Sequence, residues 1–243
     1  QRIVLTYRDI GNGERGTILT ASISGTSMTF GTAAVFSQDP RRIHSTYDSN
    51  QQRVVCAYDD EGLNQGRSIV IKTGYTQATG GTIADGSAVI VNANGTVSSV
   101  SQTTNSESLG AEVQFNGQNS VYTSACFDSV AGKCVVFYRD RGASNAGKYI
   151  VGTISGQSIT YGSEDFFASA SRTQYNSAVF EPVAGKVVIA YQDQDGSFYG
   201  KVRVGTLSGT SITWGTPVTF NSNETTYIEA VYHTGEGKIV VAY

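Results

Sequence analysis

The sequence predicts an all-β protein made of about four repeats of roughly 52 residues, each with four strands, in the manner of a β-propeller. Three elements recur in one order. They are Tyr-x-Asp at Tyr7/Asp9, Tyr58/Asp60, Tyr138/Asp140 and Tyr191/Asp193, Gly-x-x-x-x-Phe at Gly31/Phe36, Gly110/Phe115, Gly162/Phe167 and Gly215/Phe220, and Ser-Gly at Ser24, Ser155 and Ser208. Helical periodicity is absent, because Gly, Ser and Asn interrupt every window. A β-barrel or a β-sandwich completed by a strand from a neighbour is the alternative fold.

Each repeat supplies four strands, as the last full copy illustrates. We expect strand one at residues 174–180, strand two at 186–191, strand three at 199–208 and strand four at 211–220. Strand two is an apolar run, which predicts that both of its faces are buried. Strands three and four alternate more between polar and apolar residues and should be partly exposed.

The second repeat carries an insertion. Gly16 and Gly31 are 15 residues apart, whereas the corresponding Gly66 and Gly110 are 44 apart, so 44 − 15 = 29 residues are added. Two alternating runs flank Asn94-Gly95, a dipeptide that favours a type I′ turn because both central residues need positive φ. We therefore expect one extra hairpin at about residues 75–105, within a single domain that spans residues 1–243.

Strand two occurs once more than four complete repeats require, because a copy stands at each end of the chain. If the last half-repeat closes on the first, one apolar strand is surplus, and its unpaired edge is a template for pairing with another chain. We therefore expect the N-terminal strand to insert into a neighbouring subunit, as in donor-strand complementation. Its residues are Ile3, Val4, Leu5, Thr6 and Tyr7. An internal covering role for the strand, or a truncated chain, would also account for the count.

Charge and composition exclude several partners. The chain has 17 basic and 20 acidic residues and no Lys/Arg run, which disfavours nucleic acid and anionic membranes. No apolar run approaches the length of a membrane-spanning helix, so we expect no membrane insertion. The Gly- and Tyr-rich composition, the missing initiator Met and the glycosylation sequons at Asn94 and Asn223 indicate a secreted chain, located outside the cell or on its surface.

The three cysteines have different expectations. Cys56 stands where another repeat has Ile189, which predicts a buried thiol. Cys126 and Cys134 flank a predicted hairpin turn and could face each other across it. Sequence cannot fix the register, so a disulfide and two free thiols both stay open.

The sequence offers little for catalysis, and we expect no enzyme activity, no metal and no cofactor. The two histidines, His44 and His233, lie in or beside strand one of different repeats, without a Ser-His-Asp order or a Glu-rich metal motif. The Asp residues of the Tyr-x-Asp motif recur at the repeat period, which indicates a structural role as acceptors for turn amides. These turn residues are Asp9, Asp60, Asp140 and Asp193.

A lectin would need aromatic rings on which sugars could stack. Phe30, Tyr161 and Trp214 precede a Gly in three repeats, whereas Leu109 stands at that place in the second. Packing between repeats is the favoured role of these side chains, because aromatic residues dominate protein cores.

The repeat "KVVIAYQD…YGKVRVGTLSGTSITWGTPVTF" resembles uncharacterised secreted or surface proteins of microbes and phages, in which Tyr-x-Asp and Ser-Gly-Thr-Ser-Ile-Thr-x-Gly blocks recur. The resemblance covers most of the chain outside the insertion and implies no activity. The architecture is also similar to fibre subunits that assemble by donor-strand exchange. We therefore expect a structural subunit of an extracellular filament, whose partners are copies of itself. The alternative is a carbohydrate-binding β-propeller lectin or a phage fibre receptor-binding module, whose partner is a glycan.

Overall fold

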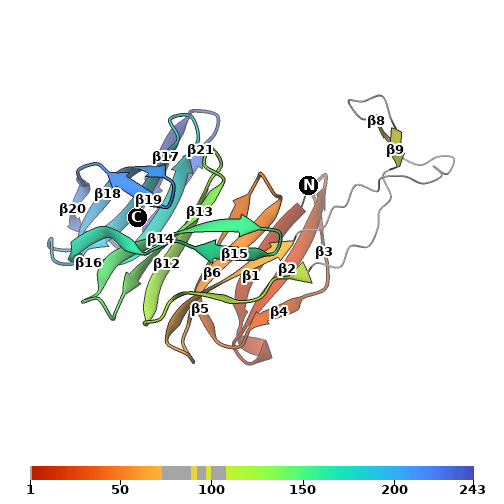
Figure 1. Cartoon of the computed structure of the whole chain (residues 1–243), viewed down its shortest axis with the longest axis horizontal. Helices are drawn as coiled ribbons and strands as arrows, with labels where there is room; N and C mark the ends of the chain where they lie inside the picture. Colours follow the sequence, from red (N-terminus) through yellow and green to blue (C-terminus); the bar gives the residue numbers. More distant parts are fainter. Residues whose placement is uncertain (1, 73–88, 92–96, 100–107) are drawn as a thin grey trace.

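The computed structural model describes residues 2–72, 89–91, 97–99 and 108–243, and this part of the chain is all-β. Its sheets are antiparallel, none of them is closed, and they follow one another in sequence order (Figure 1). The all-β class is therefore confirmed. The one helical element among the described residues is a single 3-10 turn at Ile10–Asn12, so none of these residues forms a helix that could cross a membrane.

The strands fall into five groups, which we call sheets 1 to 5, and a separate hairpin. Sheet 1 contains β1 (Arg2–Asp9), β2 (Arg15–Ser24), β3 (Ser27–Phe30) and β4 (Ala34–Ser37). Sheet 2 contains β5 (Pro40–Asp48), β6 (Arg53–Asp60), β7 (Gln65–Lys72), β10 (Ser108–Leu109) and β11 (Val113–Asn116). Sheet 3 contains β12 (Ser120–Asp128), β13 (Lys133–Asp140), β14 (Ala146–Ser155), β15 (Ser158–Tyr161) and the first part of β16 (Asp165–Glu181). Sheet 4 contains the second part of β16, β17 (Lys186–Asp193), β18 (Tyr199–Ser208), β19 (Ser211–Trp214) and β20 (Val218–Glu224). Sheet 5 contains β21 (Glu229–His233) and β22 (Lys238–Ala242), and the hairpin contains β8 (Val89–Val91) and β9 (Val97–Ser99).

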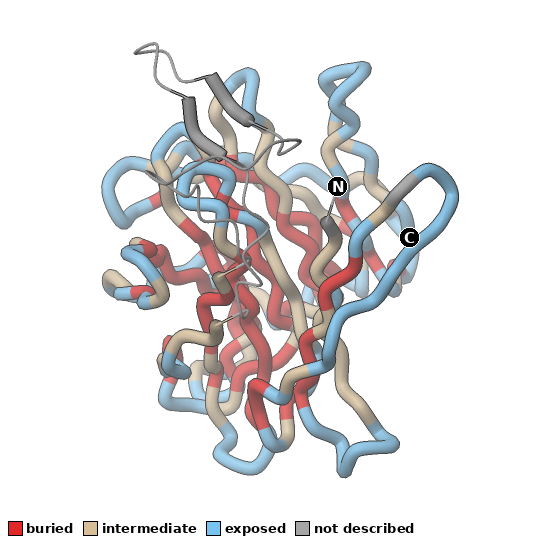
Figure 2. Tube along the Cα trace, turned by 90° about the vertical axis from the view of Figure 1, so that its right-hand side faces the viewer, coloured by how far each residue is buried: buried red, intermediate tan, exposed pale blue. Residues whose placement is uncertain are grey.

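The core consists of apolar layers between successive sheets. β6 shows the arrangement, since Val54, Cys56 and Tyr58 join the cluster shared with sheet 1, whereas Val55 and Ala57 join the cluster shared with sheet 3. β6, β13 and β17 are buried along nearly their whole length, as their apolar runs predict. Figure 2 shows buried residues along the strands and exposed residues in the connections between them.

Strands β1 and β22 have the same kind of sequence but are less buried. Each belongs to a sheet that packs against another sheet on one face: β1 on the side of sheet 2 and β22 on the side of sheet 4. Leu5 is therefore 39% exposed, and Val240 is 50% exposed, although both occupy strands of the type that is buried elsewhere.

The N-terminal strand is part of its own sheet. β1 pairs with β2 along its whole length, from Arg2 opposite Ser22 to Asp9 opposite Arg15, and it forms the edge of sheet 1. The side chain of Thr6 also makes a 2.7 Å hydrogen bond to that of Ser45 in sheet 2. The five copies of strand two are thus β1, β6, β13, β17 and β22, and β16 joins sheets 3 and 4, which hold β13 and β17, into one nine-stranded sheet.

The disulfide that the sequence left open does not form, and Cys56, Cys126 and Cys134 are all free, buried thiols. The register of β12 and β13 places Cys134 opposite Phe127 and Cys126 opposite Val135. Because neighbouring residues of a strand point to opposite faces, Cys126 packs in the cluster between sheets 3 and 4, and Cys134 in the cluster between sheets 2 and 3.

The insertion in the second repeat is described only in part. β8 and β9 pair antiparallel, with Val89 opposite Ser99 and Val91 opposite Val97. The turn dipeptide Asn94-Gly95, and with it the sequon at Asn94, lies outside the described residues. The second sequon residue, Asn223, is exposed on β20.

Candidate functional site

An open pocket of about 320 Å³ lies where the first strands of sheets 2 to 5 begin. Its lining comes from the four strands in turn: Arg42, Ile43 and His44 of β5, Tyr122 and Thr123 of β12, Tyr175 and Asn176 of β16, and Tyr227, Ile228 and Glu229 at the start of β21. The pocket is therefore built from equivalent positions of successive repeats, each of which supplies a different set of side chains.

A β-bulge creates three of these four positions, whereas Tyr227 to Glu229 stand at the entry to β21, whose pairing with β22 has no register shift. In β5, Arg41 pairs with Asp59 and His44 pairs with Ala57, so Arg42 and Ile43 together stand opposite the single residue Tyr58. The same register shift occurs in β12 and β16, opposite the Tyr of the corresponding Tyr-x-Asp motif. Bulges are frequent next to functional sites because the extra residue redirects a side chain out of the sheet.

The first residue of each position has a left-handed backbone, both at the three bulges and at the entry to β21. The φ angle is 45° at Arg42, 55° at Tyr122, 50° at Tyr175 and 54° at Tyr227. A large side chain in this region costs about 1–3 kcal/mol, and such strain is concentrated at functional sites. Four bulky residues at one repeated strained position therefore mark the pocket as the candidate site.

The left-handed positions align three tyrosine rings in a row, which we call the tyrosine row. The ring centroids of Tyr122 and Tyr175 are 5.4 Å apart, and those of Tyr175 and Tyr227 are 5.2 Å apart. The guanidinium of Arg42 lies 4.7 Å from the centroid of Tyr122, a cation–π distance. The ring of Tyr227 is the most accessible, since this residue is 80% exposed.

Polar groups lie beneath the tyrosine row. Both side-chain amide atoms of Asn176 are buried without a hydrogen-bond partner, although the residue lines the pocket. The hydroxyl of Thr123 donates to Oδ1 of Asp59, and Arg42 Nη1 lies 3.3 Å from Oδ2 of the same carboxyl. Burial raises the pKa of Asp59 to about 7, although the Thr123 hydrogen bond and the Arg42 charge act in the opposite direction.

Side chains just after the bulges connect one sheet to the next. His44 Nδ1 accepts a hydrogen bond from the Ala125 amide at 3.1 Å, so the ring proton of the neutral imidazole is on Nε2. In the next sheet, Ser124 Oγ accepts a hydrogen bond from the Ala178 amide at 3.0 Å. In the sheet after that, Ser177 Oγ accepts a hydrogen bond from an amide of β21. Burial lowers the pKa of His44, and the Glu229 carboxylate offsets this only in part.

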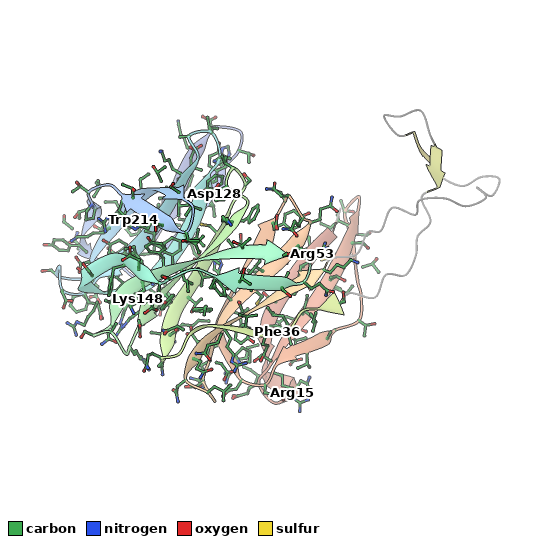
Figure 3. All side chains as sticks on the ribbon, in the orientation of Figure 1. Arg15, Phe36, Arg53, Asp128, Lys148 and Trp214 are labelled. Carbon is green, nitrogen blue, oxygen red and sulfur yellow. The ribbon has the colours of Figure 1, made fainter. Side chains whose placement is uncertain are left out.

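The Asp residues of the Tyr-x-Asp motif are the last residues of their strands, directly before the turns, and none of them lines the pocket. Oδ1 of Asp60, Asp140 and Asp193 accepts from the amide of Leu63, Gly142 and Gly196, respectively, at 2.8–3.0 Å. Asp140 also pairs with Lys148 at 2.9 Å (Figure 3). Asp9 precedes the 3-10 turn and makes no side-chain cap hydrogen bond.

The aromatic residues singled out from the sequence lie elsewhere. Tyr161 packs against the cluster between sheets 2 and 3, and its hydroxyl is 2.7 Å from Ser68 Oγ. Trp214 (Figure 3) packs edge-to-face against Phe137 and Tyr149 in the next cluster. Phe30 is 54% exposed on sheet 1.

Sequence reasoning missed the tyrosine row, although its spacing was visible. Tyr122 and Tyr175 are 53 residues apart, Tyr175 and Tyr227 are 52 apart, and Arg42 precedes Tyr122 by 80. These separations match those between Tyr58, Tyr138, Tyr191 and Tyr243 in strand two. Aligning strand one in the same way would have revealed the row.

The remaining predicted residues add no further site. Ile3 to Tyr7 lie within β1. His233 Nδ1 accepts the amide of Glu236 in a turn. Within the described part of the chain, His, Cys, Asp and Glu form no cluster of three or more that could hold a metal ion.

No protein-family model matches the chain, and no curated protein matches its sequence. The function of the chain is therefore inferred from the geometry of the pocket.

Proposed function

We propose that the chain is an extracellular carbohydrate-binding module of β-propeller architecture, and that the tyrosine row is its binding surface. The observation that carries this proposal is the placement of Tyr122, Tyr175 and Tyr227 at three successive left-handed positions, with their rings in one row in a pocket. The apolar face of a sugar ring packs on an aromatic ring, while the sugar hydroxyls need polar partners nearby. Asn176, with its unpartnered amide, is such a partner in the pocket wall.

The propeller architecture is supported by how the sheets meet. Blades of a propeller pack face to face around an axis, and the first strand of each blade lies nearest that axis. Apolar layers separate successive sheets here, and the strands β5, β12, β16 and β21 are joined to one another by side-chain hydrogen bonds such as that of His44 to Ala125. On this proposal the pocket lies at one end of the axial channel.

Binding, and not catalysis, is the proposed role. Asp59 is the acidic group beneath the pocket whose pKa is near neutrality, but its carboxyl is 7% exposed. One oxygen accepts from Thr123 and the other faces Arg42. A general acid or base must reach the substrate proton directly or through one water, and this carboxyl is held by protein groups on both oxygens.

The test is a glycan array followed by calorimetric titration of the glycans retained. Tyr227→Ala removes the most exposed ring of the row and should weaken binding about fivefold or more, since stacking on an aromatic ring contributes on the order of 1 kcal/mol or more. Tyr47→Ala is the matched control, because Tyr47 is also exposed and lies at the far end of β5. Equal affinities of the two variants for the same glycan, or an array without any retained glycan, would contradict the proposal.

A filament subunit is the second candidate, and the edge position of β1 favours it. β1 is bonded to β2 on one side and stands at the end of the strand order, so a strand of a neighbouring subunit could add to its other side. Exchange of β1 itself would first have to break its pairing with β2. Leu5→Lys places a charge on this strand and should abolish filaments seen by negative-stain microscopy if assembly occurs there. Filaments unchanged by this substitution would exclude β1 as the contact.

A further inference from the structure

We propose that the pocket selects anionic saccharides, and that Arg42, Arg139 and Arg141 bind the acidic substituent while the tyrosine row carries the sugar rings. This inference rests on the proposed carbohydrate-binding function and adds the chemical class of the ligand. Its basis is a concentration of positive charge beside Tyr122 that acidic residues neutralise only in part.

Four arginines gather at this end of the tyrosine row, in a chain whose net charge is −3. Arg42 and Arg139 both lie near the ring of Tyr122, with guanidinium carbons 4.7 and 5.8 Å from its centroid. Burial lowers the pKa of Arg139, and the positive charges of Arg141, Arg172 and Arg42 lower it further. These cations are thus close enough to one another to interact.

The arginines differ in how their charge is compensated. Arg172 forms a 2.9 Å ion pair with Asp195 and is satisfied. Arg42 faces Asp59, whose pKa is raised to about 7 by burial, so this carboxyl is a weak counter-ion near neutral pH.

Arg139 and Arg141 form no ion pair among the described residues, and their acidic neighbours act on them only at longer range, Asp195 on Arg139 and Asp59 on Arg141. The guanidinium of Arg139 donates to Oδ1 of Asn145 at 2.9 and 2.8 Å and to Oε1 of Gln194 at 3.4 Å, which are neutral amide oxygens. Arg141 is exposed, and its side chain makes no ion pair or hydrogen bond within the described part of the chain. Guanidinium groups bind carboxylate, sulfate and phosphate through paired N–H donors. An anionic substituent on the ligand would therefore give both guanidinium groups a charged hydrogen-bond acceptor.

The pocket also gives the ligand a direction. Arg42 stands at the Tyr122 end of the row, whereas Glu229 lines the pocket beside Tyr227 and accepts a 3.1 Å hydrogen bond from Ser177 Oγ. A negative group on the ligand is attracted to the first end and repelled from the second. An acidic sugar therefore places its anion on the arginines and its neighbouring ring on Tyr175 and Tyr227.

The test compares three probes by calorimetric titration: a trigalacturonate, a sulfated chondroitin tetrasaccharide and a neutral galactose oligomer of similar length. The acidic probes should bind at least tenfold more tightly than the neutral one, because hydrogen bonds to charged groups are stronger than neutral ones. Arg141→Gln should remove most of this difference without affecting the fold. Arg15→Gln, at an exposed arginine of β2 outside the pocket, is the control and should leave it unchanged.

The outcomes separate the inference from the proposed function. Tighter binding of an acidic probe that is lost in Arg141→Gln supports the inference, and the stronger of the two acidic probes distinguishes a carboxylate from a sulfate ligand. Equal binding of acidic and neutral probes, or a difference that Arg141→Gln leaves intact, overturns the anionic preference while carbohydrate binding stands. If none of the three probes binds and the glycan array retains nothing, the proposed function fails and the inference fails with it.

Discussion

Ser124→Ala tests whether side-chain hydrogen bonds hold successive sheets together. Ser124 is fully buried in β12, and its Oγ accepts the amide of Ala178 in β16 at 3.0 Å. The two strands are not paired with each other, so no ladder hydrogen bond replaces this contact. In the variant, the Ala178 amide is left buried without an acceptor.

The expected cost follows from that orphaned donor. Leaving one buried amide unpaired costs about 1–3 kcal/mol, and removal of the buried hydroxyl itself returns a small part of this. We therefore expect the free energy of unfolding to fall by about 1–2 kcal/mol. With a urea m-value of about 2 kcal/mol/M, the unfolding midpoint should move by about 0.5–1 M while m is unchanged.

The assay is urea unfolding followed by circular dichroism, with Ser49→Ala as the matched control. Ser49 is exposed in the turn after β5, and an exposed substitution of this kind should change stability by less than about 0.5 kcal/mol. If the midpoint of Ser124→Ala moves no further than that of Ser49→Ala, the hydrogen bond does not hold the two sheets together.

Three further predictions concern pH and packing. Burial lowers the pKa of His44, so the unfolded state takes up its proton first and stability is lost as pH falls below about 6.5. His44→Ser keeps a hydrogen-bond acceptor and should reduce the fall of the unfolding midpoint between pH 7.5 and pH 5. Burial raises the pKa of Asp59 to about 7, so the native state keeps the proton to higher pH than the unfolded state, and this carboxyl lowers stability as pH rises from about 4 to 7. Asp59→Asn should remove that decrease, and an unchanged pH profile of the unfolding midpoint would contradict the assignment. A Cβ at Gly147 would lie 2.6 Å from Phe167 Cζ, so Gly147→Ala should cost about 1–3 kcal/mol of unfolding free energy. Gly62→Ala is the control, because a Cβ there has its nearest contact at 3.6 Å and the substitution should be close to neutral.

The close approach at Gly147 explains why glycine stands at equivalent places of three repeats, at Gly16, Gly66 and Gly147. The ring of Phe167 lies over Gly147, just as that of Phe36 lies over Gly16 and that of Phe115 over Gly66. A side chain at these glycines would displace the ring. The Gly-to-Phe relation is thus a packing contact between neighbouring strands of one sheet.

The sequence by itself determined the strand order and the burial of the central strands. The apolar runs that became β6, β13 and β17, and the turn residues Asp60, Asp140 and Asp193, are local signals, because strand alternation and turn chemistry involve residues close in the chain.

Tertiary structure alone decided where β1 pairs, which way each cysteine faces and where the pocket lies. In the sequence, Tyr122 and Tyr175 look like ordinary strand residues, because the bulges that bring their rings together depend on pairing register with strand two. A register shift of one residue moves every side chain to the other face of a strand, as the separation of Cys126 from Cys134 shows. Register is set by contacts between residues distant in the chain, and for this reason the strand pattern was predictable from the sequence whereas the pocket was not.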